Sequence, residues 1–541
     1  MVLFGTLSIK NYQLKIIDRL PFQEINSIPQ AIKDFLSGEI SGFETDTFSL
    51  DNFQRKINAK SESFTQQQRE KLFSALKKQT FERNSSPLQV KNLHSLLDEK
   101  TFTITTGHQL NLFTGPVFFI YKILQTIKTA EFLKNHFPEK NFVPIFWMAT
   151  EDHDFEEINH FRTENHFYEI HGKKGGAVGR IEIQDSSFIS EFQQEFKDSV
   201  FGTELILLMK EAYKKGYSLA EATRNIVDRL FAEYGLMIID GDDQLLKSDM
   251  KEIFKNEIFE KSLYKNTEKQ VENLREKYGK VQVNPREINL FYLSKTRNRI
   301  DPDGENFVID DTEKIFSATE IIKELEKNPE KFSPNALLRP VYQERILPNI
   351  AYIGGNAEIM YWLELKNHFE KLNLVFPVLI PRNSMLFVSE KNIRKIEKNQ
   401  LHIKDFFKDF QNLMNSVLIA NNEISKQLEE KQKLIETNFE ELKQVAEITD
   451  ITFGNLVKSE EKRQLKSYEK MRKRLIRAEK IKQNEKVERL EKLFLQIHPG
   501  KNWQERVFNF SVFYADFGKQ WLETCLKEMD VQKSELIVMQ Y

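Results

Sequence analysis

The chain has 541 residues, of which 40% are hydrophobic and 30% are charged, and its formal net charge is −2. This length predicts two or three folding units, and the balance of apolar and charged residues excludes a wholly disordered chain. The near-neutral charge excludes a uniformly basic protein that coats nucleic acid, although a local basic face stays open.

No segment predicts a secreted protein or one that spans a membrane. The N-terminal residues lack the basic and apolar regions of a signal peptide, and no apolar run approaches the ~20 residues of a membrane span. The single cysteine, Cys525, excludes an intramolecular disulfide framework and a multi-cysteine zinc site. We therefore expect a cytoplasmic protein with no membrane partner, in which Cys525 is a core residue instead of a catalytic thiol.

The first clear pattern along the chain is a βαβ unit. Alternating, β-branched residues 101–107 predict a strand, and apolar residues at helical spacing in 116–137 predict a helix. Pro116 suits the first turn of that helix. The apolar run 143–150 predicts a buried strand, and because a helix crosses over between the two strands, they are expected to be parallel.

Two more apolar runs, 236–240 and 375–381, predict further strands of the same open α/β sheet, and 356–372 predicts a helix before the last strand. Between these runs the sequence changes to charged helical segments and a hairpin-like stretch with a turn at residues 301–304. We interpret residues 160–230 and 245–335, approximately, as insertions into a core domain of residues 1–389.

Residues 390–495 are almost entirely helix formers. An antiparallel coiled-coil hairpin is predicted, with an acidic first arm and a basic second arm that reverse direction around Gly454. The basic run has two interpretations, a solvated face, which we favour, or a surface for tRNA or another polyanion. Residues 496–541 regain Pro, Gly and aromatic residues and are expected to pack back on the core. The residues that predict the apolar seam are Leu428, Ile435 and Leu442 in the first arm and Tyr468, Met471, Leu475 and Ala478 in the second.

The loop between the first strand and its helix is the first candidate site. In an open α/β sheet, ligands bind beyond the carboxyl ends of the strands, where helix N-termini offer free N–H groups. The spacing matches neither a Walker loop nor a dinucleotide fingerprint. We assign the loop to a phosphate or carboxylate, with a structural role for His108 as the alternative. The candidate residues are Thr106, Gly107, His108, Gln109, Asn111, Thr114 and Gly115.

An acidic cluster follows the second predicted strand. Carboxylates at a strand end can bind an amino group or sugar hydroxyls, act as a general base or hold Mg²⁺, and a histidine between two acids can move a proton. A zinc site is not expected, because no cysteine or matched histidine pair completes it. The alternative is a solvated acidic start of a helix. The candidates are Glu151, Asp152, His153 and Asp154.

Two later segments supply further candidates. Gly354 and Gly355 precede a predicted helix and permit a close approach of the backbone to a ligand, although a tight turn explains them equally well. Arg339 and Arg382 stand at segment ends, where they could clamp a carboxylate or phosphate or form structural ion pairs.

Seven segments together resemble the bacillithiol biosynthesis cysteine-adding enzyme family, and the likeness extends over nearly the whole chain. The resemblance implies a Rossmann-like core, related to class I aminoacyl-tRNA synthetases and nucleotidyltransferases, with connective insertions and a coiled coil that pairs two subunits. The segments are LPFQEIN (20–26), TTGHQLNLFTGP (105–116), FWMATEDHDFEEINH (146–160), LMIIDGDD (236–243), RPVYQERILPNIAYIGGNAEIMYW (339–362), VLIPRNS (378–384) and HPGKNWQERVFN (498–509).

The resemblance also implies a reaction, the addition of L-cysteine through its carboxyl group to the amine of glucosaminyl-malate. Amide formation is uphill in water, so we expect carboxyl activation, with ATP or another nucleotide as the candidate cosubstrate; the sequence implies no particular metal. The related synthetases carry a second histidine and a lysine-rich loop, whereas this chain offers His108 alone and Arg382 in place of the lysines.

From this resemblance and the residue chemistry we assign roles to two sets of residues. His108, Asp152, His153 and Asp154 form the expected catalytic set, in which the last three orient or deprotonate the amine. Substrate or nucleotide binding is assigned to the loop residues 106–115 and to a second set outside the loop. That second set is Glu151, Tyr342, Gly354, Gly355, Glu358, Trp362, Arg382, Gln504 and Arg506.

Two other functions stay open from the sequence alone. The chain could be a class I synthetase-like tRNA ligase, or a non-catalytic coiled-coil scaffold with a nucleotide-binding head. We expect nucleic acid to be an unlikely partner, because the net charge is slightly negative. The expected assembly is a homodimer through the coiled coil, with cysteine and glucosaminyl-malate as the small-molecule partners.

Overall fold

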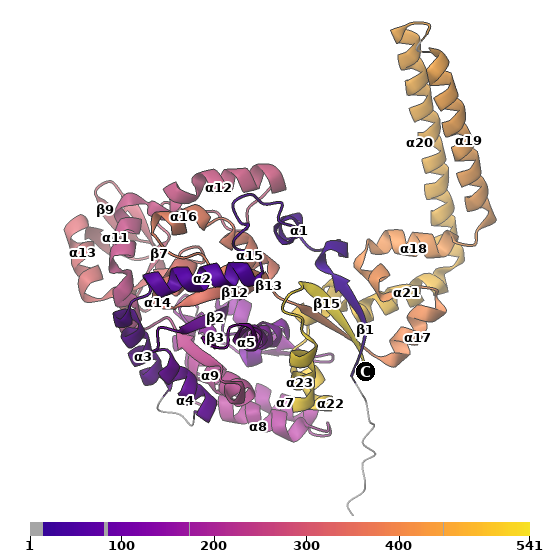
Figure 1. Ribbon diagram of the computed structural model, residues 1–541. Coiled ribbons are helices and arrows are strands. Elements are labelled where there is room, and N and C mark those ends of the chain that lie inside the picture. Colours follow the sequence, from indigo (N-terminus) through magenta and orange to yellow (C-terminus); the bar gives the residue numbers. More distant parts are fainter. Residues whose placement is uncertain (1–13, 81–84, 173, 447) are drawn as a thin grey trace, which may run out of the picture. The chain divides into compact units, whose positions relative to one another are not determined.

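The computed structural model describes residues 14–80, 85–172, 174–446 and 448–541 (Figure 1). The chain divides into two compact units. The first comprises the described residues up to Glu24, Ile28–Leu386 and Gln504–Met539, and the second comprises Ile25–Ser27, Phe387–Trp503 and Gln540–Tyr541.

A five-stranded parallel sheet forms the centre of the first unit, in the order β13-β12-β2-β3-β6. The predicted parallel α/β sheet is therefore confirmed, but one strand next to its middle, β12, was not predicted. Gly107 pairs with Trp147, and Trp147 pairs with Ile239, so the carboxyl ends of three strands meet at one edge. The strands are β2 (Thr101–His108), β3 (Asn141–Met148), β6 (Met237–Asp240), β12 (Asn349–Gly354) and β13 (Val378–Pro381).

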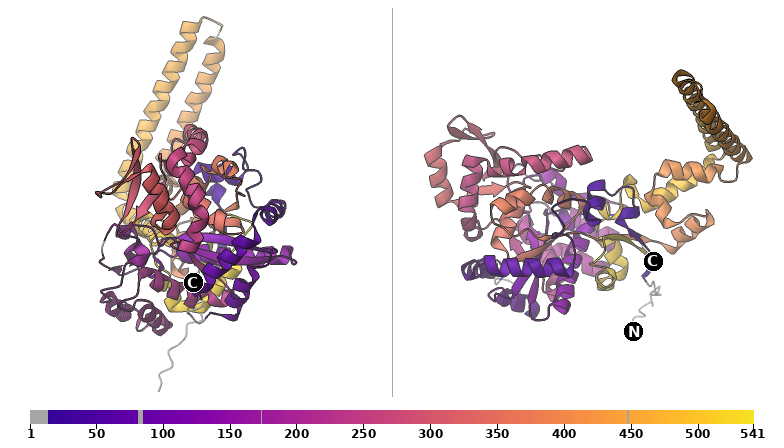
Figure 2. Two further views of the ribbon diagram at one scale, coloured as in Figure 1. Left: turned by 90° about the vertical axis from the view of Figure 1, so that its left-hand side faces the viewer. Right: turned by 45° about the horizontal axis from the view of Figure 1, so that its top comes forward.

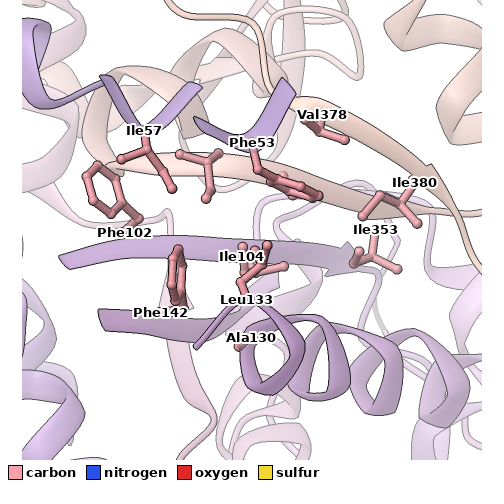
Figure 3. Packing of buried hydrophobic residues seen from close by; sticks show 12 residues of the cluster. Phe53, Ile57, Phe102, Ile104, Ala130, Leu133, Phe142, Ile353, Val378 and Ile380 are labelled. Carbon is pink, nitrogen blue, oxygen red and sulfur yellow. The ribbon is translucent and has the colours of Figure 1, made fainter. Parts of the chain in front are cut away.

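Apolar side chains from four of these strands pack against two helices (Figure 3). Helix α2 (Leu50–Ser63) contributes Phe53 and Ile57, and helix α5 (Phe118–His136) contributes Ala130 and Leu133. Burying side chains of this size stabilises the fold by about 1.5–3 kcal/mol each. This core fixes α5, and therefore the β2–α5 loop, against the sheet edge.

The first insertion contains a two-stranded sheet and three main helices. The strands are β4 (His160–Arg162) and β5 (Phe167–Glu169), and the helices are α7 (Phe188–Phe196), α8 (Gly202–Ala212) and α9 (Leu219–Phe231).

The second insertion contains helices and a five-stranded antiparallel sheet in the order β10-β9-β8-β7-β11. The predicted hairpin is β8 and β9 of this sheet, with its turn at Gly304. The elements are α11 (Lys251–Glu260), α12 (Ser262–Tyr278), β7 (Leu290–Leu293), β8 (Arg297–Asp303), β9 (Asn306–Ile309), β10 (Ile315–Ser317), α13 (Ala318–Lys327) and β11 (Phe332–Pro334).

Shorter elements complete the first unit. Among them, α23 contacts α5 and carries the fully buried Cys525, and burial raises the pKa of this thiol, as expected of a core cysteine. The predicted helix 356–372 is two helices, α15 and α16. These elements are β1 (Lys15–Pro21), α1 (Gln30–Leu36), α3 (Gln66–Thr80), α4 (Pro87–Ser95), α6 (Phe155–Ile158), α10 (Gln244–Lys247), α14 (Arg339–Ile346), α15 (Asn356–Trp362), α16 (Lys366–Lys371), β14 (Ser384–Val388), α22 (Ser511–Phe517), α23 (Lys519–Glu528) and β15 (Glu535–Gln540).

The second unit is helical, and its longest helices run antiparallel as a coiled-coil hairpin (Figures 1 and 2). Two ion pairs connect the arms, Lys443–Glu461 at 2.7 Å and Glu429–Arg472 at 3.6 Å. The helices are α17 (Glu390–Lys398), α18 (Phe410–Ile419), α19 (Glu423–Ala446), α20 (Ile451–Lys482) and α21 (Asn484–Ile497), of which α19 and α20 form the hairpin.

The reversal falls at the start of the predicted segment 449–455 and not at Gly454, which is inside α20. Asp450 caps this helix by accepting hydrogen bonds from the amides of Thr452 and Phe453 at 2.6 and 2.9 Å. A carboxylate at an N-cap is a stronger helix start than a glycine. Of the predicted seam residues, Leu442 and Met471 are 50% and 43% exposed in the single chain, so their place in an apolar seam stays a prediction. Within the described ranges, no helix is long and apolar enough to cross a membrane.

Candidate functional site

A cavity of about 850 Å³ lies at the carboxyl edge of the parallel sheet, between the core and the second insertion. Its volume is in the range of small-molecule sites. Eight of the predicted site residues line it: Gly107, His108, Gln109, Glu151, Asp152, His153, Arg339 and Glu358. Other residues of its lining are Phe118, Lys122, Trp147, Arg286, Phe291, Arg297, Arg299, Tyr352 and Tyr361.

Asp152 is the accessible carboxylate of the acidic wall. It accepts hydrogen bonds from the Gln109 side chain and from the amide of His153, both at 2.7 Å, and 26% of its side chain is exposed. Gln109 is held in turn by Glu157 at 2.9 Å. Since no lysine or arginine of the described residues forms an ion pair with Asp152, this carboxylate is available to a cationic amine.

The acids on either side of Asp152 have other partners. Glu151 forms a buried ion pair with Lys247, and burial raises the pKa of Glu151 despite that partner. Asp154 caps the short helix α6 by accepting a hydrogen bond from the amide of Glu157 at 3.2 Å, and it does not line the cavity. Its predicted catalytic role stays a prediction, and the structure gives its side chain a capping role.

His153 lies between the acidic wall and the inserted sheet. Its Nδ1 is 3.0 Å from the guanidinium of Arg297. Burial, and then the charge of Arg297, lower the pKa of His153, so the ring is neutral near pH 7. Because arginine only donates hydrogen bonds, Nδ1 must accept, and the ring proton is on Nε2. The ring therefore presents a hydrogen-bond donor, which fits positioning of a substrate better than proton removal.

A buried ion pair forms the wall next to strand β2. Lys122 Nζ donates to the Gly107 carbonyl and to both carboxylate oxygens of Glu358, at 2.7 and 2.8 Å from the latter. Glu358 also accepts from the hydroxyl of Tyr352 at 2.6 Å and from the amide of Gly355 at 3.1 Å. Burial opposes the charge of Glu358, but Lys122 outweighs it, so the pKa of Glu358 is lowered. The pair is thus charged and fully hydrogen-bonded on its acidic side.

His108 ends strand β2 between two aromatic rings. Its ring centroid is 5.2 Å from that of Phe118 and 5.1 Å from that of Phe119. Both ring nitrogens are buried and make no hydrogen bond with any residue that the structure describes. Burial, and then the charge of Lys122, lower the pKa of His108 to about 3. At neutral pH this side chain is an uncharged donor and acceptor with free hydrogen-bonding capacity.

The lowered pKa of His108 predicts that acid destabilises the protein. Between pH 6.5 and about 3 the unfolded chain takes up a proton at this histidine while the folded chain does not. The contribution of the neutral His108 to the free energy of unfolding is therefore fully present above pH 6.5 and is lost as the pH falls through this range. Urea unfolding at pH 7 and at pH 5 measures this effect. We expect the free energy of unfolding to fall between these two pH values by about 1–2 kcal/mol more in the wild type than in the His108→Gln variant. An equal loss in both proteins would contradict the assignment.

The remaining loop residues hold the loop itself. Thr106 donates from its hydroxyl to the Ile353 carbonyl at 2.8 Å, and Asn111 donates to the Glu157 carbonyl at 3.4 Å. Thr114 and Gly115 have φ values of 69° and 61°, and a Cβ on Gly115 would lie 2.6 Å from Asn111 Cβ. The structure places Thr106, Asn111, Thr114 and Gly115 behind the cavity surface, so their assignment to a ligand stays a prediction.

Residues 504–506 of the C-terminal segment pack beside Arg382 and Phe118. Arg382 forms a buried bidentate ion pair with Glu505, at 2.7 and 3.0 Å, and Gln504 is also buried. Arg382 and Arg506 place their guanidinium groups 4.9 and 5.6 Å from the centroid of the Phe118 ring. Arg382, Gln504 and Arg506 do not line the cavity. The guanidinium of Arg382, which the sequence analysis assigns to an anion, is paired with Glu505.

The other predicted residues outside the lining are Tyr342, Trp362, Gly354 and Gly355. The hydroxyl of Tyr342 donates to the Gly241 carbonyl at 2.9 Å. Trp362 is fully buried, with its ring centroid 4.7 Å from that of Tyr352. Gly354 ends strand β12 and Gly355 donates its amide to Glu358. These residues support the wall formed by Tyr352 and Glu358.

Of the basic part of the cavity, the sequence reasoning named only Arg339, which lines it and donates to the Gln343 side chain at 2.9 Å; it missed the other arginines and Lys122. Arg297 and Arg299 are two residues apart on strand β8, so their side chains share one face of the sheet, and Arg286 precedes strand β7. Lys122 is the one charged residue in the apolar run 117–127. Two sequence features could have indicated these residues: a single lysine, Lys122, in an apolar helical run, and two arginines, Arg297 and Arg299, at alternate positions of a strand.

Comparisons with known proteins agree with this arrangement. Residues 17–383 match the model of the bacillithiol biosynthesis BshC N-terminal Rossmann-like domain, and residues 385–541 match that of the BshC C-terminal coiled-coil domain. A protein of Flavobacterium johnsoniae named "Putative cysteine ligase BshC" is 39% identical over 95% of this chain and 97% of its own length. Proteins with the same name are 41% identical in Flavobacterium psychrophilum, over 93% and 95% of the two chains, and 36% in Christiangramia forsetii, over 96% and 98%. The chain therefore belongs to the BshC family of bacillithiol biosynthesis, whose members combine a Rossmann-like domain with a coiled-coil domain.

Proposed function

We propose that this protein joins the carboxyl group of L-cysteine to the amine of glucosaminyl-malate and so forms bacillithiol. One observation carries the proposal: a single cavity has on one wall the carboxylate of Asp152, which pairs with no lysine or arginine of the described residues, and several cationic side chains on the others. Such a cavity can hold an amine and anionic groups together. The name shared by the relatives supports a cysteine ligase.

Asp152 is the proposed acceptor of the amine proton. A protonated amine beside this carboxylate must lose a proton before or while its nitrogen attacks the carbonyl carbon of cysteine. The ammonium loses two protons in all: the first leaves to solvent and gives the neutral amine. The second passes to Asp152 as the new C–N bond forms and the bond from the carbonyl carbon to its leaving group breaks. Gln109 and the amide of His153 fix the carboxylate from behind, so the proton acceptor is oriented before the substrate arrives.

Carboxyl activation is the second part of the proposal. The free carboxylate of cysteine has no good leaving group at neutral pH. ATP or another nucleotide would supply one by activating this carboxyl group. The residues that fit its anionic groups are His108, whose buried ring nitrogens lack a partner in the described structure, and Gly107 at the strand end, whose carbonyl is held by Lys122. We propose no metal ligand, and the described residues contain no cluster of three or more acidic, histidine or cysteine side chains suited to one.

The reaction can be tested directly with purified protein. Cysteine and glucosaminyl-malate are incubated with and without ATP, and the product is followed by mass spectrometry. We expect a product with the mass of both substrates less one water, formed only when a nucleotide is present. Formation without a nucleotide would overturn the activation step alone. No product with ATP, other nucleotides or cell extract would favour a non-catalytic head or a tRNA ligase.

We also propose that the protein is a homodimer paired through the coiled coil. Apolar side chains of the hairpin are exposed in the single chain, among them Leu442 at 50% and Leu456 at 54%. The double variant Leu442→Glu, Leu456→Glu is expected to shift the mass measured by light scattering from two chains to one. Glu441→Gln, on the same helix, should keep the two-chain mass. A wild type with the mass of one chain at micromolar concentration would contradict the proposal.

A further inference from the structure

Two arginines of the second insertion reach the cavity without a partner. Arg286 precedes strand β7 and is exposed, and Arg299 lies on β8 and is half-buried. Neither guanidinium makes an ion pair or a hydrogen bond with any side chain or carbonyl of the described residues. Both side chains line the same cavity, and burial, and then the charge of Arg286, lower the pKa of Arg299. Two like charges held together at a cavity wall call for an anion between them.

Neighbouring acids act on this pair without forming an ion pair with it: the charges of Asp301 and Asp310 raise the pKa of Arg299. The nearest acids, Asp301 and Asp310, are hydrogen-bonded to each other, and burial, followed by Asp310, raises the pKa of Asp301. Neither acid lines the cavity or lies within ion-pair distance of Arg286 or Arg299. The third arginine of this wall is different, because Arg297 donates to Ser333 at 2.9 Å, to the Pro334 carbonyl at 2.7 Å and to His153.

The arginine pair and Asp152 lie within reach of one small molecule. The ring of Phe291 connects them: its centroid is 4.9 Å from the guanidinium carbon of Arg299 and 5.4 Å from the ring centroid of His153. His153 in turn is bonded to Asp152 through its amide. The side chains of Phe291 and His153 therefore connect Arg299 to Asp152 along one wall of the cavity.

We propose that Arg286 and Arg299 bind the two carboxylates of the malate group of glucosaminyl-malate while its amine lies at Asp152. This inference rests on the proposed function and names the part of the substrate that the insertion recognises. Guanidinium groups bind carboxylates through paired, charge-assisted hydrogen bonds, and two adjacent arginines match a dicarboxylate. An aminosugar without malate would leave both arginines unpaired, so the pair selects the malate-bearing amine.

The phosphates of a nucleotide are the other anion that two arginines could take. The dicarboxylate is favoured because the pair comes from the insertion, whereas His108, at the end of β2 with both ring nitrogens free of partners in the described residues, fits the anionic groups of a nucleotide. Arg382, the alternative anion ligand, is already paired with Glu505. A single test can separate the two anions if it measures each substrate in turn.

The test uses Arg286→Gln, Arg299→Gln and the double variant in the amide-forming assay. We expect the KM for glucosaminyl-malate to rise about tenfold in each single variant and about 100-fold in the double variant. The KM values for cysteine and nucleotide should stay within about twofold, and kcat/KM for methyl glucosaminide, which lacks malate, should not change. Arg299→Lys should recover part of the loss, because it restores charge without the bidentate geometry.

Lys269→Gln is the matched control, since Lys269 is an exposed cation on α12 of the same insertion and does not line the cavity. The proposal would be overturned if the arginine variants lost kcat/KM equally for glucosaminyl-malate and methyl glucosaminide. A rise in the KM for nucleotide alone would also overturn it. Calorimetric binding of glucosaminyl-malate tests the pair independently of catalysis. If the wild type binds it and the double variant does not, the arginine assignment stands even where no product forms; equal binding by both proteins would overturn it.

Discussion

Replacing Asp152 with asparagine is expected to lower the rate of amide formation by about 10²–10⁴-fold, the range attributed to a general base. The asparagine has the same shape and can still contact Gln109, but it cannot accept the proton of the amine. The folded structure should be unchanged, because 26% of the Asp152 side chain is exposed and it forms no ion pair with a lysine or arginine of the described residues. Initial rates of product formation by mass spectrometry measure the effect.

Glu156→Gln is the control for this variant. Glu156 lies on the same acidic segment, two-thirds of its side chain is exposed, and it pairs with Lys174 on the surface instead of lining the cavity. Its rate should stay within about twofold of the wild type, since surface ion pairs contribute little. Asp152→Asn with a rate similar to that of Glu156→Gln would remove Asp152 from the reaction.

Replacing Lys122 with methionine is expected to lower the free energy of unfolding by about 3–5 kcal/mol. The change leaves the carboxylate of Glu358, whose side chain is 23% exposed, with only the hydroxyl of Tyr352 and the amide of Gly355 as donors, and it removes the donor to the Gly107 carbonyl. Urea unfolding at pH 7 gives the measurement. Adding Glu358→Gln to Lys122→Met should recover part of the loss, because an unpaired buried charge is removed.

Lys128→Met on the same helix separates this effect from the loss of any lysine. Lys128 is half-buried and forms no ion pair with another described residue, so its variant should lose less than about 0.5 kcal/mol. Equal destabilisation by the two variants would show that the buried pair contributes nothing special. Because Lys122 lowers the pKa of Glu358, the wild type should also lose this stabilisation as the pH falls toward that pKa.

The fold was largely predictable from local patterns. The βαβ unit follows from the alternation in residues 101–107 and the helical spacing after Pro116, and the long arms of the coiled coil follow from a region with very little Gly or Pro. Strand β12 was not predicted because Asn349–Gly354 is short and ends in glycine. Its strand conformation depends on pairing with β2 and β13 on either side, which no local pattern reveals.

The candidate site was predictable only where it follows the strand ends. Gln109 and Asp152 come directly after β2 and β3, so topology alone brings them to one sheet edge. Arg286 and Arg299 lie more than 130 residues further along, and they reach the cavity through the folding of an insertion. Arg382 shows the opposite case, in which a residue at a strand end is paired internally by Glu505.

The central claim is that one cavity holds the amine and the anionic groups of a single substrate at the same time. A crystal structure of the protein with glucosaminyl-malate tests it most directly. The account predicts the amine nitrogen within hydrogen-bond distance of Asp152 and the malate carboxylates on Arg286 and Arg299. Density for the same molecule on another surface, or with its amine directed away from Asp152, would contradict it.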